Sequence, residues 1–311
     1  MTAFPRALPL LLAMLPFTAA HAADATEAIT QEKNACEQQE QQKGTGEKAS
    51  SVVCAIKIMF QSRIRRRKDT EPVEMTVGSP PMQSEDTETP GPNNWEINFA
   101  MQADFAGRER RIEFPVFDIN YGKGDRWQFT YEIPYVFQTK LEPNALGRDQ
   151  QVHANGVGDS TLGIKYRFYD NEDNGLSFAI YPQFEVRTPG ANRDVSEGHT
   201  ILVLPLIMTK EFEHASISAN VGVEAGAGER SYFASLGVGW RTNANIALMA
   251  EIAGTDLNVP EQKRFLLNFG IRRKISTTQS ITAAVGRDIY AGGEERKHNH
   301  LTLAYQKLFG D

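Results

Sequence analysis

Acidic and basic side chains recur at every second position of segments that are otherwise apolar. Such groups can pair with one another or bind a polar solute. Burying them in the core of a soluble protein would be costly, so they need close pairing or a hydrated interior. The candidates are Glu96, Asp118, Glu132, Lys165, Arg167, Glu185, Arg187, Glu224, Arg241, Glu251 and Arg272.

A short stretch, His298-Asn299-His300, contains residue types found in hydrolase and metal sites. Acyl transfer needs a nucleophile, a base and an orienting group that meet in space, and no serine motif accompanies these residues. A metal site would also lack evident carboxylate or cysteine partners nearby. We therefore expect no catalytic residue, no bound metal and no cofactor.

Glycine-rich runs and overall charge do not indicate a nucleotide or nucleic-acid site. Residues 156–159 and 222–228 are rich in glycine, but neither run opens a helix, as a phosphate cradle requires. The net charge of −6 over 311 residues argues mildly against nucleic acid as a partner. The hydrophobic content of 41% and mean hydropathy of −0.41 fit a soluble protein or a β-barrel in which every second strand residue faces lipid.

The stretch 156–184 shows which elements position the charged residues. Apolar residues alternate with small, polar or charged ones over 160–168 and 176–184, and a polar break at 170–175 supplies a turn. A period of two over about ten residues predicts two strands of membrane-spanning length. Tyr166 and Phe168 then face lipid, whereas Lys165 and Arg167 face the lumen.

Segments of the same kind follow one another from residue 95 to residue 309. They predict an all-β fold, a transmembrane antiparallel up-and-down β-barrel of about 12 strands. The expected strands are 95–105, 111–121, 127–138, 160–168, 176–185, 200–212, 217–223, 232–240, 246–252, 265–271, 281–285 and 301–309. Pro115 predicts a bulge in the second strand. The sixth is apolar on both faces, which leaves its register open.

The lengths of the connections alternate in support of this topology. The longer ones (140–155, 188–199, 254–264, 288–297) fall on one side, and the opposite side has only short ones (121–126, 170–175, 213–215, 242–245, 274–279). Short periplasmic turns, longer external loops and both termini in the periplasm are typical of outer-membrane barrels. Twelve strands predict a narrow or plugged lumen, in which pairing of the charges across facing strands is favoured over a solute site.

Aromatic residues gather near the ends of the expected strands, as in the interfacial girdles of membrane barrels. They are Trp95, Phe105, Tyr121, Trp127, Phe137, Phe168, Tyr169, Phe212, Tyr232, Trp240, Tyr290 and Phe309.

The N-terminal third is different. Residues 1–22 have a basic start, an apolar core and an Ala-His-Ala cleavage site, which predicts a secretory signal peptide. Residues 23–94 form a polar, low-complexity periplasmic segment with a basic cluster at 63–68 and a proline-rich linker from 69. This segment could plug the lumen or hang in the periplasm. Cys36 and Cys54 form a disulfide or remain free thiols with even odds.

Several motifs carry a resemblance to a known family: 117–122, Asp125-Arg126, 132–135, 156–159 and Lys165-Tyr166. With them the chain resembles, over about 95–309, an outer-membrane β-barrel family of transporters linked to the phenol meta-cleavage degradation pathway. The resemblance implies passive passage of small, often aromatic or apolar, molecules. It transfers no site residues.

The expected partners are outer-membrane lipid, the barrel-assembly machinery and a small-molecule solute, and nucleic acid is not expected. Two alternatives remain. The barrel could be structural or serve assembly, with its N-terminal segment binding a periplasmic partner. Less favoured is an outer-membrane lipid-modifying enzyme that uses the rim at 298–300.

Overall fold

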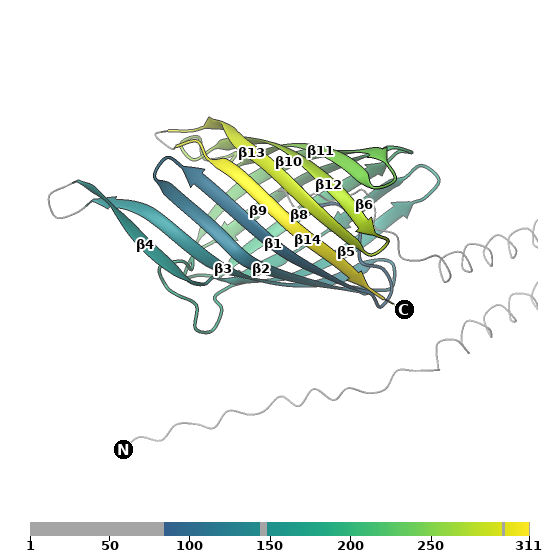
Figure 1. Cartoon of the computed structure of the whole chain (residues 1–311), viewed down its shortest axis with the longest axis horizontal. Helices are drawn as coiled ribbons and strands as arrows, with labels where there is room; N and C mark the ends of the chain where they lie inside the picture. Colours follow the sequence, from purple (N-terminus) through teal and green to yellow (C-terminus); the bar gives the residue numbers. More distant parts are fainter. Residues whose placement is uncertain (1–83, 144–147, 294–295, 311) are drawn as a thin grey trace, which may run out of the picture. The chain divides into compact units, whose positions relative to one another are not determined.

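The computed structural model describes residues 84–143, 148–293 and 296–310, and their regular structure is entirely β (Figure 1). The strands are β1 (Trp95–Ala106), β2 (Glu109–Lys123), β3 (Trp127–Pro143), β4 (Asp149–Val157), β5 (Ser160–Asn171), β6 (Leu176–Ile180), β7 (Gln183–Val186), β8 (Ile201–Glu211), β9 (Ala215–Gly226), β10 (Glu229–Asn243), β11 (Ile246–Thr255), β12 (Arg264–Ser276), β13 (Gln279–Ala291) and β14 (Asn299–Phe309). Within these described ranges, no helix is long and apolar enough to cross a membrane.

The strands close into one antiparallel barrel, because β1 pairs with β2 on one side and with β14 on the other. Two positions around the barrel are each occupied by two successive strands. β4 and β5 pair with successive parts of β3, and β6 and β7 pair with successive parts of β5. The barrel therefore has twelve strand positions around its circumference, which confirms the fold expected from the sequence.

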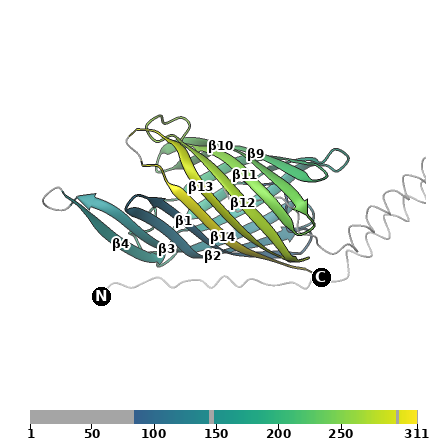
Figure 2. The same cartoon turned by 45° about the horizontal axis from the view of Figure 1, so that its top comes forward.

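The connection expected at 140–155 is mostly strand. β3 continues to Pro143, and β4 pairs with it from Val157 back to Asp149, so that only a short link separates them. This hairpin projects beyond its neighbours in both views (Figures 1 and 2). Strands outside the membrane need no apolar lipid face, so the polar sequence there was wrongly interpreted as a loop.

The two uncertain strands are settled by their pairing. Between β2 and β3 the register shifts from Glu113 to Val116, which confirms the bulge predicted at Pro115. In β8, Ile207 is fully buried and points inward, whereas its neighbour Leu206 is exposed on the outside. Ile207 packs with Ala179 and Tyr181 in a small cluster of buried apolar residues.

The outer surface of the barrel carries large apolar side chains on nearly every strand. Eleven of the twelve aromatic residues that the sequence assigned to girdles are exposed; Tyr121 is partly covered, its ring 4.8 Å from that of Trp95. Trp95, Trp127 and Trp240 lie near the short turns, and Phe105 and Tyr232 near the long loops. Such extensive apolar exposure is incompatible with water but suits a lipid bilayer.

Candidate functional site

The candidate site is the lumen, and its half near the short turns is crossed by residues 84–94, which we call the strap. Ser84 N donates to Glu251 Oε2 on β11 (2.5 Å), Glu85 N to Asn220 Oδ1 on β9 (2.9 Å) and Thr87 N to Thr209 Oγ1 on β8 (3.1 Å). The strap thus crosses from β11 towards β2, whose Gly122 it reaches through Asn93 and Asn94.

The close approach of the strap to β2 requires glycine at position 122. A Cβ atom there would lie 2.0 Å from the carbonyl oxygen of Gly91. Asn93 N donates to Gly122 O and Gly122 N donates to Asn94 O, both at 2.9 Å. The strap is therefore fitted to the inner wall, and β1 begins directly after it at Trp95.

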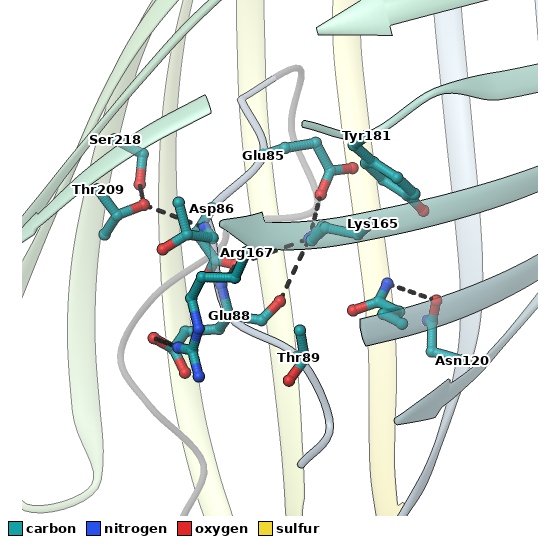
Figure 3. A network of polar contacts seen from close by, with 12 residues as sticks. Glu85, Asp86, Glu88, Thr89, Asn120, Lys165, Arg167, Tyr181, Thr209 and Ser218 are labelled. Atoms are coloured by element: carbon teal, nitrogen blue, oxygen red, sulfur yellow. Dashed lines mark hydrogen bonds and ion pairs between the residues drawn. The ribbon is translucent and has the colours of Figure 1, made fainter. Parts of the chain in front are cut away.

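Ion pairs hold the middle of the strap to β5 (Figure 3). Lys165 Nζ lies 3.2 Å from Glu85 Oε2 and 3.9 Å from Asp86 Oδ1, and Arg167 Nη1 lies 3.1 Å from Glu88 Oε1. The sequence led us to expect pairing across facing strands. For these two cations that expectation was wrong, because the closest carboxylates come from the strap.

The surroundings of these ion pairs are largely shielded from solvent. Lys165 is only 3% exposed, its Nζ atom 4.8 Å from the centre of the Tyr181 ring. Burial raises the pKa of the Glu88 carboxyl above its usual range, even though the Arg167 guanidinium lowers it. Holding Glu88 in the lumen as a carboxylate therefore costs free energy, which its ion pair only partly offsets.

The other half of the lumen, near the long loops, contains an open cavity of about 830 Å³, which we call the vestibule. Its wall is mainly acidic. The ionisable lining residues are Arg111, Glu113, Glu132, Asp159, Glu185, Glu197, His199, Glu224, Glu229, Arg230 and Asp256. Charges that seemed mixed along the sequence are thus separated in space: carboxylates dominate the vestibule, and two buried cations hold the strap.

The connection between β7 and β8, residues 187–200, is fastened beside the vestibule. Asp159, at the break between β4 and β5, accepts hydrogen bonds from Ser196 Oγ (2.6 Å) and Glu197 N (2.8 Å). Asn192 Nδ2 donates to Asn155 O (2.7 Å) on β4. These contacts anchor the loop to a neighbouring strand instead of leaving it free in solvent.

The eleven residues predicted to line the lumen separate into three groups. Lys165, Arg167 and Glu251 contact the strap, while Glu132, Glu185 and Glu224 line the vestibule. The remaining five have hydrogen-bond partners elsewhere or lie exposed, although Arg272 and Asp118 also interact electrostatically with Asp86 and Glu85 of the strap. Asn98 Nδ2 bonds both Glu96 and Asp118, Arg187 donates to Ala191 O, Arg272 Nε donates to Thr282 Oγ1, and Arg241 lies exposed near the end of β10.

His300 is held by carboxylates on the inner side of the wall. Its Nδ1 lies 2.5 Å from Asp104 Oδ1 on β1, and its Nε2 lies 3.2 Å from Asp288 Oδ1 on β13. Both ring nitrogens are therefore engaged, and the ring is turned away from lipid. No group of three or more potential ligands suited to a metal ion occurs among the described residues.

The strap carboxylates contact the lumen wall, and the sequence alone did not predict this. Glu85, Asp86 and Glu88 were assigned to a proline-rich linker, although Lys165 and Arg167 were expected to point into the lumen. The strap carboxylates and the two β5 cations have opposite charges and a similar spacing along the chain. That complementarity could have indicated that they meet in the lumen. The signal peptide, the Cys36–Cys54 pair and the basic cluster at 63–68 lie outside the described residues.

Comparison with known proteins gives one family and several structures. Residues 81–293 match the model of a family described as "Putative MetA-pathway of phenol degradation". An outer-membrane channel from Pseudomonas putida F1 has a similar structure, with 14% identity and a TM-score of 0.57 over 73% of this chain and 100% of that chain. The KdgM porin follows at 8% identity and 0.49, covering 69% and 99%. No curated protein matches the sequence.

Proposed function

Because the chain belongs to the family described as "Putative MetA-pathway of phenol degradation", whose model matches two thirds of it, we propose that it forms a channel in the outer membrane. Small solutes cross it passively, aromatic molecules with polar groups among them. The chain supplies no covalent chemistry for this passage. Its role is to provide a hydrated path through the bilayer.

The observation that carries this proposal is the vestibule inside a closed, lipid-facing barrel. A cavity of about 830 Å³ lies within the size range of small-molecule sites. Its many carboxylates repel anions and attract cations at low ionic strength, so solutes enter according to charge as well as size. A barrel that served only as a structural element would have no need of such a space.

The strap restricts passage through the other half of the lumen. The strap is bonded to β11, β9, β8 and β5, so solutes must pass beside it or displace it. Its polar contacts can be exchanged for contacts with water, which makes displacement less costly than moving an apolar plug. The channel therefore has a low conductance while the strap is in place.

Planar-bilayer recordings test the proposal. The mature wild-type chain is compared with a variant in which the strap acids are neutralised, Glu85→Gln with Asp86→Asn and Glu88→Gln. We expect small conductance steps for the wild type and at least threefold larger ones for the variant. Folding is checked by the mobility difference between heated and unheated samples. Folded proteins that pass no current in either form would exclude the channel and favour the structural alternative.

A further inference from the structure

The buried cations Lys165 and Arg167 present a second feature of the lumen, distinct from the open vestibule. Both belong to β5 and point inward, two residues apart, which places their backbones roughly 7 Å from each other. Lys165 is 3% exposed and Arg167 is 8% exposed. Cations buried this deeply need an anionic partner, because an unpaired buried charge is strongly unfavourable.

The strap supplies those anionic partners, and its carboxylates lie against the two cations as those of a bound ligand would. Glu85 and Asp86 lie against Lys165, and Glu88 lies against Arg167. The carbonyl oxygen of Glu88 also accepts from Lys165 Nζ at 3.4 Å. Of the charged partners of Arg167 in the described structure, only Asp170 belongs to the barrel wall, at 3.5 Å.

Within the described ranges, the strap leaves one hydrogen-bond donor of Arg167 without a partner. Arg167 Nε is buried and has no hydrogen-bond partner among the described residues. A planar carboxylate can accept from Nε and from a terminal nitrogen of a guanidinium at the same time. Glu88 accepts from Nη1 and the carbonyl oxygen of Asp125 accepts from Nη2 (2.6 Å), so Nε remains the donor that an anion approaching differently could use.

We propose that Lys165 and Arg167 form a binding site for small dicarboxylates, which the strap acids occupy in the absence of a solute. The strap is joined directly to β1, so its carboxylates compete at a high effective concentration. A dicarboxylate that reaches β5 from the end with the short turns, and so avoids the acidic vestibule, replaces Glu85 and Glu88 and releases the strap from this wall. Binding and opening of the lumen are thereby coupled.

The Tyr181 ring extends the site on one side. Its hydroxyl donates to Thr130 Oγ1 at 2.8 Å, which fixes the ring beside Lys165. Gly163 leaves room for it, because a Cβ atom there would lie 2.7 Å from the ring. A flat aromatic acid can therefore contact this ring while its carboxylate pairs with Lys165.

Isothermal titration calorimetry on the full mature chain in detergent tests the proposal. Glutarate is the probe, and the uncharged glutaramide, which has the same carbon skeleton, is the control ligand. The wild type is compared with the variant carrying Glu85→Gln, Asp86→Asn and Glu88→Gln. We expect glutarate to bind the variant at least tenfold more tightly than the wild type, because the internal competitor is gone. Glutaramide should bind neither protein.

Two further substitutions in the strap-neutralised background locate the site. Arg167→Gln should abolish glutarate binding, and Arg111→Gln, which removes a vestibule cation, should leave it unchanged. If the triple variant does not fold, Glu88→Gln alone takes its place, with an expected gain of at least threefold. Equal binding to wild type and variant, loss of binding with Arg111→Gln, or binding that survives Arg167→Gln would overturn the proposal.

This inference rests on the proposed channel function, but the two can fail separately. Calorimetry detects binding without any current. A barrel that conducts ions and does not bind glutarate contradicts the dicarboxylate site alone. A barrel that binds glutarate and never conducts contradicts the channel alone.

Discussion

The two halves of the lumen are enclosed by the same strands but are filled in different ways. Near the short turns, the strap occupies the space, and its acids pair with Lys165 and Arg167. Near the long loops, the vestibule stays open, and its carboxylates face a cavity of about 830 Å³. Charge in the first half is neutralised by contact within the chain, whereas charge in the second half is left for solvent and solutes to neutralise.

In the channel that we propose, this difference lets one barrel combine selection with closure. An open acidic mouth attracts or repels solutes by charge before they meet any barrier. The strap forms the barrier, and several separate polar contacts hold it. The first property depends on ionic strength, and the second depends on particular pairs of residues.

The largest expected effect comes from reversing the alternation of lipid-facing and lumen-facing residues, which defines both halves of the lumen. Ile164 is exposed on the outer face, while its neighbour Lys165 points inward to the strap. Ile164→Arg should lower the free energy of unfolding by about 2–4 kcal/mol, because it places a charge in lipid. Lys165→Ala should cost the barrel much less, because the acids that lose their partner, Glu85 and Asp86, belong to the strap and can turn towards water when it shifts. Urea unfolding in lipid vesicles measures both, and equal tolerance would contradict the assignment of the faces.

A covalent lock on the strap tests whether its half of the lumen is a movable barrier. Thr87 Oγ1 and Ser177 Oγ lie 2.5 Å apart, close to the distance that two bonded sulfurs need. Thr87→Cys with Ser177→Cys, in a background with Cys36→Ser and Cys54→Ser, should conduct several-fold less when oxidised than when reduced. The single Thr87→Cys variant serves as the control. Identical conductance in both redox states would mean that the strap does not move during passage.

Neutralising the vestibule should change selectivity and leave the strap in place. Glu132→Gln, Glu185→Gln and Glu224→Gln together remove three lining carboxylates. We expect the ratio of cation to anion permeability to fall about threefold at low salt, and the difference to shrink in concentrated salt. Reversal potentials across a salt gradient measure this ratio. Glu142→Gln, at the exposed end of β3, should have no effect.

The smallest expected effect comes from crowding the wall behind Lys165. In Gly163→Ala the added Cβ lies 2.7 Å from Tyr181 Cε2, so the ring must move. We expect a loss of about 1 kcal/mol in the free energy of unfolding, which is typical of mild overpacking. Adding Tyr181→Ala should make the Gly163→Ala change nearly neutral, because the clash is gone. A double-mutant cycle by urea unfolding measures this coupling.

Much of the fold could be predicted from the sequence, because strand alternation is a local property. Lys165 and Ile164 were assigned to opposite faces from their neighbours alone, and Pro115 indicated its bulge because it lacks a backbone donor. The hairpin of β3 and β4 was missed because its residues lie beyond the apolar band and show no such alternation.

The candidate site was predicted only in part. The sequence placed Glu132 and Arg167 on the inner face, but it gave no reason to put the first beside open space and the second beside Glu88. A pattern along one strand determines which way a side chain points. It does not determine what lies opposite, since that depends on the curvature of the wall and on segments from elsewhere in the chain.

By itself, the sequence determined a closed barrel with an apolar outside and a charged inside, because both follow from a period of two within each strand. Only the tertiary structure decided that the strap enters the lumen and that carboxylates gather at the other end. Lys165 and Glu85 are 80 residues apart in the chain, and no local pattern encodes their meeting. Closure of the barrel brings them together, because it surrounds the strap with strands whose charged side chains point inward. Buried charges of this kind are stable only when they are paired.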